Sequence, residues 1–263
     1  MKGATITSSS SVFLKMRKMK NTLIIVISLL LLSSCSKQLI PTLYLMGDST
    51  MADKPDLDYP ERGWGQLLPV FFDSAQLKIE NHAKNGRSTR SFIYEGRWDS
   101  LSAKLKEGDF LVIQFGHNDG GIQKTDRYAT PAEYRYNLKK FVEEAQNKGV
   151  NPILCTPIVR RNFENGKLID THGEYPEIVR KLSSELNVPL IDMQQKSQNL
   201  VSELGDEGSL PLFLQIPAGV YEKVPEGKID NTHFSEKGAI TMAQLFVDEI
   251  KKQQLKLSKF MKK

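Results

Sequence analysis

Short strand-like runs alternate along the chain with longer stretches of helical periodicity. The strand-like runs are 43–46, 78–81, 110–115, 152–156 and 189–192. The clearest helical patterns are 98–106, 131–148, 175–186 and 236–252. Most of the runs are continuously apolar rather than alternating, which is typical of strands that are buried on both faces. The pattern therefore predicts an α/β fold, with a parallel sheet covered by helices on both sides and connected by right-handed crossovers.

The first 34 residues are typical of a lipoprotein signal peptide. They carry five cations and no acidic residue, and their apolar run, 23–32, is far shorter than the roughly 20 residues that a membrane span needs. Residues 32–35 (LSSC) resemble a bacterial lipobox, in which the cysteine is lipidated after cleavage. This implies an exported bacterial lipoprotein, in the periplasm or at the cell surface, anchored to a membrane through Cys35. The alternative is an ordinary signal peptide with an incidental cysteine.

The remaining residues, 35–263, are predicted to form one nearly neutral domain. The whole chain has 36 Lys and Arg against 31 Asp and Glu, but five of the cations lie in the leader. The pI of about 9.0 therefore does not indicate nucleic-acid binding, which needs a basic stripe on the folded domain. Cys155 lies in an apolar run, so we expect a buried, inert thiol.

A serine stands directly after the first strand-like run, in the sequence Gly47-Asp48-Ser49. At the carboxyl end of a strand in an open parallel sheet, a side chain projects into the crevice where such folds bind ligands. Ser49 is therefore the candidate nucleophile, and a helix is expected to begin there. A serine that only caps a helix is the alternative interpretation.

Three later blocks lie where the same edge of the sheet collects them. Asn85-Gly86 follows the second strand, residues 116–119 (GHND) follow the third, and residues 230–233 (DNTH) precede the last helix. With Ser49, these blocks resemble those of the SGNH (GDSL-like) hydrolases, from about residue 43 to residue 255. Finer motifs are similar to the rhamnogalacturonan acetylesterases within that superfamily: 63–65 (GWG), 85–92 (NGRSTRSF), 95–97 (EGR) and 115–121 (FGHNDGG).

The resemblance implies a fold and an activity. The fold is a three-layer α/β/α arrangement with a doubly wound, five-stranded parallel sheet in flavodoxin-like order. The activity is that of a serine carbohydrate esterase, which removes acetyl groups from the pectic polysaccharide rhamnogalacturonan I. Its partner is then an acetylated polysaccharide.

Ester hydrolysis needs a nucleophile, a base and donors for the developing oxyanion. We assign Ser49 as nucleophile, His233 as base and Asp230 as the carboxylate that orients His233. The oxyanion hole is assigned to the backbone amides of Ser49 and Gly86 and the side-chain amide of Asn118. No His-x-x-x-His or Cys-x-x-Cys spacing is present, so neither a metal nor another cofactor is expected.

Other candidates are weaker. Asp170 and His172 form a second Asp-x-His pair, but no strand delivers them to the edge, so His172 is assigned a substrate contact in a loop wall. His82 and His117 flank strands and are interpreted as structural, and Asp119 as a residue that fixes its loop.

Substrate recognition is assigned to cations near Gly86. Arg87 and Arg90, with Arg97 nearby, are candidates for binding uronate carboxylates, because guanidinium groups bind them bidentately. Solvated surface arginines are the alternative. Trp64 and Tyr94 are candidates for stacking on a sugar, although Trp64 also suits a core position. Fungal members of the family have a disulfide-bearing insertion where this chain has only the loop 122–130.

Two other classes of function remain open. One is an SGNH esterase or lipase acting on lipid or thioester substrates, which needs a long apolar acyl channel. The other is a non-catalytic lipoprotein that binds glycans. The polar loops count against the first, and the presence of all four blocks counts against the second.

Overall fold

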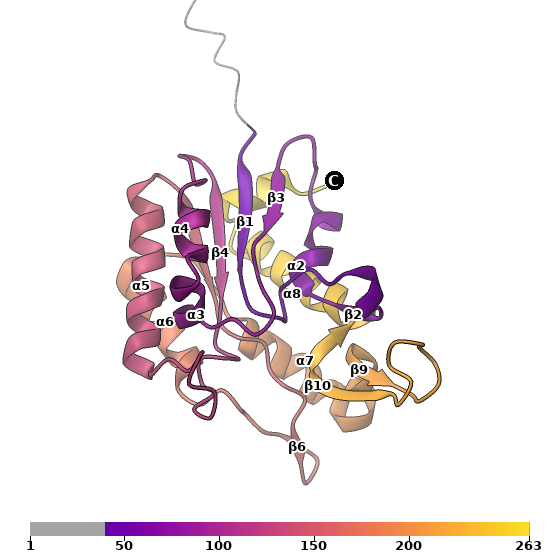
Figure 1. The fold of residues 1–263 in the computed structure, drawn as a ribbon. Coiled ribbons are helices and arrows are strands. Elements are labelled where there is room, and N and C mark those ends of the chain that lie inside the picture. The colour runs from indigo at the N-terminus through magenta and orange to yellow at the C-terminus, as the bar shows by residue number, and fades with distance from the viewer. Residues whose placement is uncertain (1–39, 263) are drawn as a thin grey trace, which may run out of the picture. The chain divides into compact units, whose positions relative to one another are not determined.

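The structure is a computed structural model and describes residues 40–262 (Figure 1). The predicted signal peptide, its boundary at residue 34 and Cys35 lie outside the described residues. Within residues 40–262, no helix is both long enough and apolar enough to cross a membrane.

Five parallel strands form the central sheet. They are β1 (Thr42–Gly47), β3 (Lys78–Asn81), β4 (Phe110–Gln114), β5 (Asn151–Cys155) and β8 (Leu190–Ile191). Their order across the sheet is β3-β1-β4-β5-β8. The chain thus places β3 at one edge beside β1, and then adds β4, β5 and β8 in turn on the other side of β1. The predicted flavodoxin-like α/β/α fold is confirmed.

Helices cover both faces of this sheet (Figure 1). One face carries α2 (Trp64–Leu67), α7 (Met193–Ser209) and α8 (Glu236–Lys252). The other carries α3 (Thr89–Tyr94), α4 (Arg97–Ser102), α5 (Pro131–Asn147) and α6 (Tyr175–Leu186). Alternate residues of a strand point to opposite faces, so Leu43 and Leu45 of β1 join the first core while Tyr44 and Met46 join the second. Burial on both faces explains why these runs are continuously apolar.

A smaller antiparallel sheet carries the C-terminal part of the site. Its strands are β2 (Glu61–Arg62), β10 (Lys228–Ser235) and β9 (Phe213–Ile216), in the order β2-β10-β9. The pairing of β10 with β9 shifts register between Asp230 and Phe234. Such an irregularity bends a strand and redirects its side chains. Residues 230–233 therefore lie on a bent strand just before α8.

The remaining elements are short. A hairpin is made by β6 (Phe163–Glu164) and β7 (Lys167–Leu168). The 3₁₀ helices are η1 (Asp56–Asp58), η2 (Leu68–Phe71), η3 (Leu210–Leu212) and η4 (Lys256–Phe260). Helix α8 packs so closely on η3 that a Cβ at Gly238 would lie only 1.7 Å from the Leu212 carbonyl oxygen.

The helix expected to begin at Ser49 is not formed, and that prediction was wrong. The Asp48 carbonyl accepts from the amides of Met51 and Ala52, and Asp48 Oδ1 accepts from the amide and hydroxyl of Thr50. These bonds close a tight turn, and α2 begins only at Trp64. Aspartate competes with helix formation in this way by bonding to nearby backbone groups.

Candidate active site

Three side chains from distant parts of the chain meet at the carboxyl edge of the sheet. The Ser49 hydroxyl donates to His233 Nε2 at 2.8 Å. The other ring nitrogen, Nδ1, donates to Asp230 Oδ2, also at 2.8 Å. Ser49 follows β1, while His233 and Asp230 belong to β10. The structure thus brings the three predicted catalytic residues into one hydrogen-bonded chain, with the geometry of a nucleophile, a base and an orienting carboxylate.

The Asp230 carboxylate is held by its own strand. Its Oδ1 accepts from the backbone amides of Thr232 at 2.9 Å and His233 at 3.0 Å, which leaves Oδ2 for the imidazole. Burial alone would raise the pKa of Asp230, but hydrogen bonds from the His233 side chain and backbone lower it well below its usual range. The carboxylate therefore stays ionised and fixes the tautomer of His233.

The predicted oxyanion donors lie in the loops on either side of Ser49. Strands β3 and β4 flank β1 in the sheet, so the loops that carry Gly86, after β3, and Asn118, after β4, leave the sheet on either side of the Ser49 turn. Asn118 Nδ2 donates to the Arg87 carbonyl at 2.9 Å, which uses one of its two hydrogens. Within residues 40–262, the backbone amides of Ser49 and Gly86 donate to no protein acceptor. These groups can therefore bind an oxyanion without breaking a native hydrogen bond.

Gly86 is required by its conformation and by a neighbour. Its φ is 76°, in the left-handed region, and a Cβ there would lie 3.0 Å from Arg127 Nη1. Arg127 binds Asp126 Oδ2 through Nε at 3.2 Å and Nη2 at 3.1 Å. In the described part of the chain, its Nη1 donates to no protein acceptor. Arg127 thus presents a free guanidinium edge beside the Gly86 loop.

Arg127 was missed from the sequence, whereas the arginines that were predicted are engaged within the protein. Arg87 donates to the Asn85 carbonyl at 2.8 Å and to Glu95 at 3.1 Å. Arg90 donates to the Tyr128 carbonyl at 3.0 Å and lies 3.5 Å from Glu133. The only sequence signal for Arg127 is its place in the loop 122–130, directly after the FGHNDGG motif.

His172 is buried and belongs to another cluster. Its Nε2 lies 3.2 Å from His117 Nδ1, and its side chain is 1% exposed. Asp170 accepts from the His172 amide, so the pair closes a turn. Burial lowers the pKa of both imidazoles below the usual histidine value. The structure does not connect His172 to Ser49, and its burial does not favour the substrate contact predicted for it.

Of the other residues singled out in the sequence, Asp119, Trp64 and Cys155 are buried and contribute to the structure of the domain. Asp119 Oδ1 accepts from the Thr89 amide at 2.8 Å and its hydroxyl at 2.6 Å, and so joins the 116–121 loop to α3; burial raises the pKa of Asp119 to about 7. Trp64 is fully buried, and its Nε1 donates to Gln114, so it belongs to the core. Cys155 is buried, as predicted, and burial raises the pKa of its thiol. Tyr94, by contrast, is 88% exposed.

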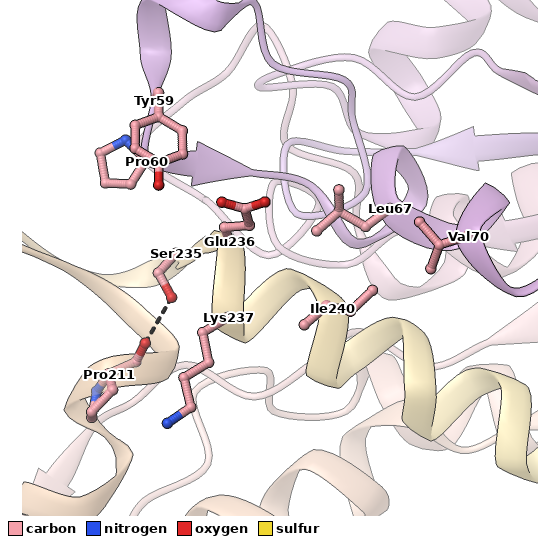
Figure 2. Close-up of a pocket in the computed structure, with 9 residues that line it drawn as sticks. All are labelled: Tyr59, Pro60, Leu67, Val70, Pro211, Ser235, Glu236, Lys237 and Ile240. Atoms are coloured by element: carbon pink, nitrogen blue, oxygen red, sulfur yellow. Dashed lines mark hydrogen bonds between the residues drawn. The ribbon is translucent and has the colours of Figure 1, made fainter.

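A surface cavity of about 550 Å³ opens beside the N-terminus of α8 (Figure 2). Its lining residues are Tyr59, Pro60, Leu67, Val70, Pro211, Ser235, Glu236, Lys237 and Ile240. The triad residues do not line it, so it is separate from the catalytic geometry. Within residues 40–262, no group of three or more His, Cys, Asp or Glu side chains is arranged to hold a metal ion.

Known proteins resemble this chain over most of its length. The family model for the GDSL-like Lipase/Acylhydrolase family matches residues 45–239, which include Ser49 and His233. The rhamnogalacturonan acetylesterase RhgT of Bacillus subtilis (strain 168) is 41% identical over 208 residues, 79% of this chain and 88% of that protein. The probable rhamnogalacturonan acetylesterase YesY of the same strain is 35% identical over 217 residues, covering 82% and 95%. The crystal structure of YxiM from Bacillus subtilis matches with a TM-score of 0.70 at 26% identity, over 82% of this chain and 57% of that one.

Proposed function

The chain belongs to the GDSL-like lipase/acylhydrolase family, and from that premise we propose that it removes acetyl groups from rhamnogalacturonan I by a Ser49–His233–Asp230 triad. Its similarity to rhamnogalacturonan acetylesterases makes it a carbohydrate acetylesterase, a carboxylic ester hydrolase. The main support for the proposed triad is the pair of 2.8 Å hydrogen bonds that join Ser49 through His233 to Asp230.

The first half of the reaction forms an acetyl-enzyme. Neutral His233 takes the hydroxyl proton of Ser49 as Oγ attacks the acetyl carbonyl, and the Asp230 carboxylate stabilises the resulting imidazolium. The amides of Ser49, Gly86 and Asn118 bind the oxyanion. The imidazolium then donates its proton to the sugar oxygen, which leaves as an alcohol.

The second half releases acetate. A water molecule replaces the sugar, His233 removes its proton, and the hydroxide attacks the acetyl-enzyme carbonyl through the same oxyanion hole. Collapse of this intermediate returns the proton to Ser49 and frees acetate. Loss of one oxyanion donor typically slows such a reaction about a hundred- to a thousand-fold.

The proposed substrate is a uronate-containing polymer because a cation faces the site. Arg127 Nη1 is directed at the Gly86 loop, which in this scheme holds the reacting carbonyl. Galacturonate residues carry a carboxylate on the same ring as the acetylated hydroxyls, and a guanidinium edge binds a carboxylate by charge-assisted hydrogen bonds. A neutral xylan offers Arg127 no such partner. The names of the relatives RhgT and YesY support the same choice.

The test is acetate release from three substrates: acetylated rhamnogalacturonan I, acetylated xylan and a long-chain 4-nitrophenyl ester. We expect the pectic polymer to give the highest kcat/KM and Ser49→Ala to lose activity on every substrate while keeping its fold. A preference for xylan would contradict the proposed polymer, and a preference for the long-chain ester would indicate a lipid substrate. More than a few per cent residual turnover in Ser49→Ala would contradict the serine mechanism.

A further inference from the structure

A line of charged side chains runs from the triad aspartate to the Gly86 loop. Lys228 Nζ lies 3.2 Å from Asp230 Oδ2, the oxygen that also accepts from His233. The same ammonium lies 3.4 Å from Glu61 Oε2. Glu61 Oε1 is 2.7 Å from Lys54 Nζ, and Lys54 Nζ donates to Asn85 Oδ1 at 2.7 Å. We call Lys54, Glu61 and Lys228 the ionic chain.

Two members of the ionic chain are largely buried, whereas the side chain of Lys228 is 39% exposed. The side chain of Lys54 is 1% exposed and that of Glu61 is 15% exposed. The backbone of Lys54 is fixed as well, because Gln66 accepts from its amide and donates to its carbonyl, both at 3.0 Å. Charges as far from water as those of Lys54 and Glu61 are costly unless they are paired, so these two side chains depend on each other.

The strand geometry explains how Lys228 reaches the triad. Residues two apart on a strand share a face, so Lys228 and Asp230 point the same way while Ile229, between them, is 82% exposed. Strand β2, which pairs with β10, brings Glu61 to the same side. Burial opposes the charged form of Lys228, but Glu61 and Asp230 raise its pKa, so the ammonium stays charged.

We propose that Lys228 is a positioning residue for the proposed triad: anchored by Glu61, which in turn pairs with Lys54, it restrains the Asp230 carboxylate, and its charge opposes protonation of the His233 ring that the same carboxylate orients. The inference rests on the proposed role of His233 as base. Lys228 shares the oxygen that stabilises the imidazolium and so weakens that stabilisation. The mechanism needs the neutral ring, so the enzyme remains active at lower pH than it would without Lys228.

Each charged group near His233 either favours or opposes protonation of its ring. Asp230, Glu61 and Asp48 favour the imidazolium, and a protonated His117 opposes it. Lys228 opposes it as well, because its ammonium lies 3.2 Å from the Asp230 oxygen that accepts from the ring. Removing Lys228 deletes an opposing charge and also frees Glu61 from one of its partners. Removing the charge of Glu61 deletes a favouring charge and leaves Lys228 to act on Asp230 alone. The two substitutions therefore have opposite effects on the protonation of the base.

The experiment measures kcat/KM against pH with 4-nitrophenyl acetate, a small substrate that does not depend on polymer binding. For Lys228→Met, we expect the acidic limb to move up by about 0.5 to 1 pH unit, and Lys228→Arg should restore its position. For Glu61→Gln, the limb should move down. Lys223→Met removes an exposed cation from the loop before β10 and should leave the profile unchanged.

Folding is checked by near-UV circular dichroism and thermal unfolding. Should Lys228→Met unfold, the charge-balanced double variant Glu61→Gln/Lys228→Met replaces it, and its limb should lie above that of Glu61→Gln, because the opposing charge of Lys228 is gone. The inference is overturned if the acidic limb of the pH profile stays in place in folded variants, or if it moves in the same direction for the Lys228 and Glu61 substitutions.

The proposed function fails as well if the wild-type protein hydrolyses no ester, or if Ser49→Ala is as active as wild type. If ester hydrolysis depends on Ser49 but the acidic limb does not move, the proposed role of Lys228 is refuted and the proposed function is not.

Discussion

At the scale of single residues, the two histidines that follow an aspartate are distinguished by their contacts. The His233 ring joins Ser49 to Asp230, whereas the polar partners of the buried His172 ring within residues 40–262 are His117 and Asp170. We expect His233→Ala to lower kcat on 4-nitrophenyl acetate by about a thousand-fold, because proton transfer itself is removed. His172→Ala should keep kcat within about threefold, and its main effect should be a lower Tm. The reverse pattern would transfer the role of base to His172.

Arg127 is expected to act through binding. Arg127→Gln removes the cation beside the Gly86 loop, so KM for acetylated pectic oligosaccharides should rise about tenfold while kcat/KM for 4-nitrophenyl acetate stays constant. The matched control is Arg135→Gln, which removes an exposed arginine that pairs with Glu185 on α6. Equal effects of the two substitutions, or a parallel loss on the small ester, would exclude a contact between Arg127 and the uronate.

At the scale of elements, α8 is fixed at the end that leads from the triad. Ser235 is its N-cap: its hydroxyl accepts from the Gly238 amide at 3.1 Å and donates to the Pro211 carbonyl at 2.7 Å. Ser235→Ala should therefore destabilise the protein by about 1 to 2 kcal/mol in urea unfolding. The control, Thr241→Ala, removes a hydroxyl that donates to the Lys237 carbonyl one turn earlier in the same helix. A urea midpoint no lower than that of the control would show that the cap contributes nothing.

The elements also show where sequence patterns are informative. Helices 175–186 and 236–252 are observed with the predicted bounds, because each has a continuous apolar face and clear ends. Helix α7 was not predicted, since its sequence contains Gly205, which has a non-helical conformation, and few apolar residues. Strand β10 was not predicted either, because its residues are mostly polar and exposed or half-buried and therefore do not form an apolar run.

At the scale of the whole molecule, the predicted lipid anchor lies outside the described residues and remains a proposal. Cys35→Ala removes the residue that a lipoprotein maturation pathway would acylate. We expect the variant to move from the membrane fraction to the soluble fraction, with unchanged kcat/KM on 4-nitrophenyl acetate, because acyl chains alone supply the membrane affinity. Unchanged fractionation would argue for simple secretion.

The topology explains which part of the site was visible in the sequence. Ser49, Gly86 and Asn118 each follow a strand of one parallel sheet, so their assembly at one edge follows from the alternation of strands and helices. The residues Lys54, Glu61, Arg127 and Lys228 lie in loops and in the small antiparallel sheet. Their contacts depend on how these segments fold over the edge, which no periodicity encodes.

The hydrogen bond between Ser49 and His233 joins residues that are 184 positions apart in the chain. Synthesis proceeds from the N-terminus, so β1 and its serine exist long before β10 and α8. A serine hydroxyl without a neighbouring base is a weak nucleophile. In the proposed mechanism, a nascent or partly folded chain therefore carries an inactive serine, and ester hydrolysis begins only when β10 brings His233 to Ser49. During refolding, the appearance of esterase activity should lag behind the return of the helical signal and report the final step of assembly.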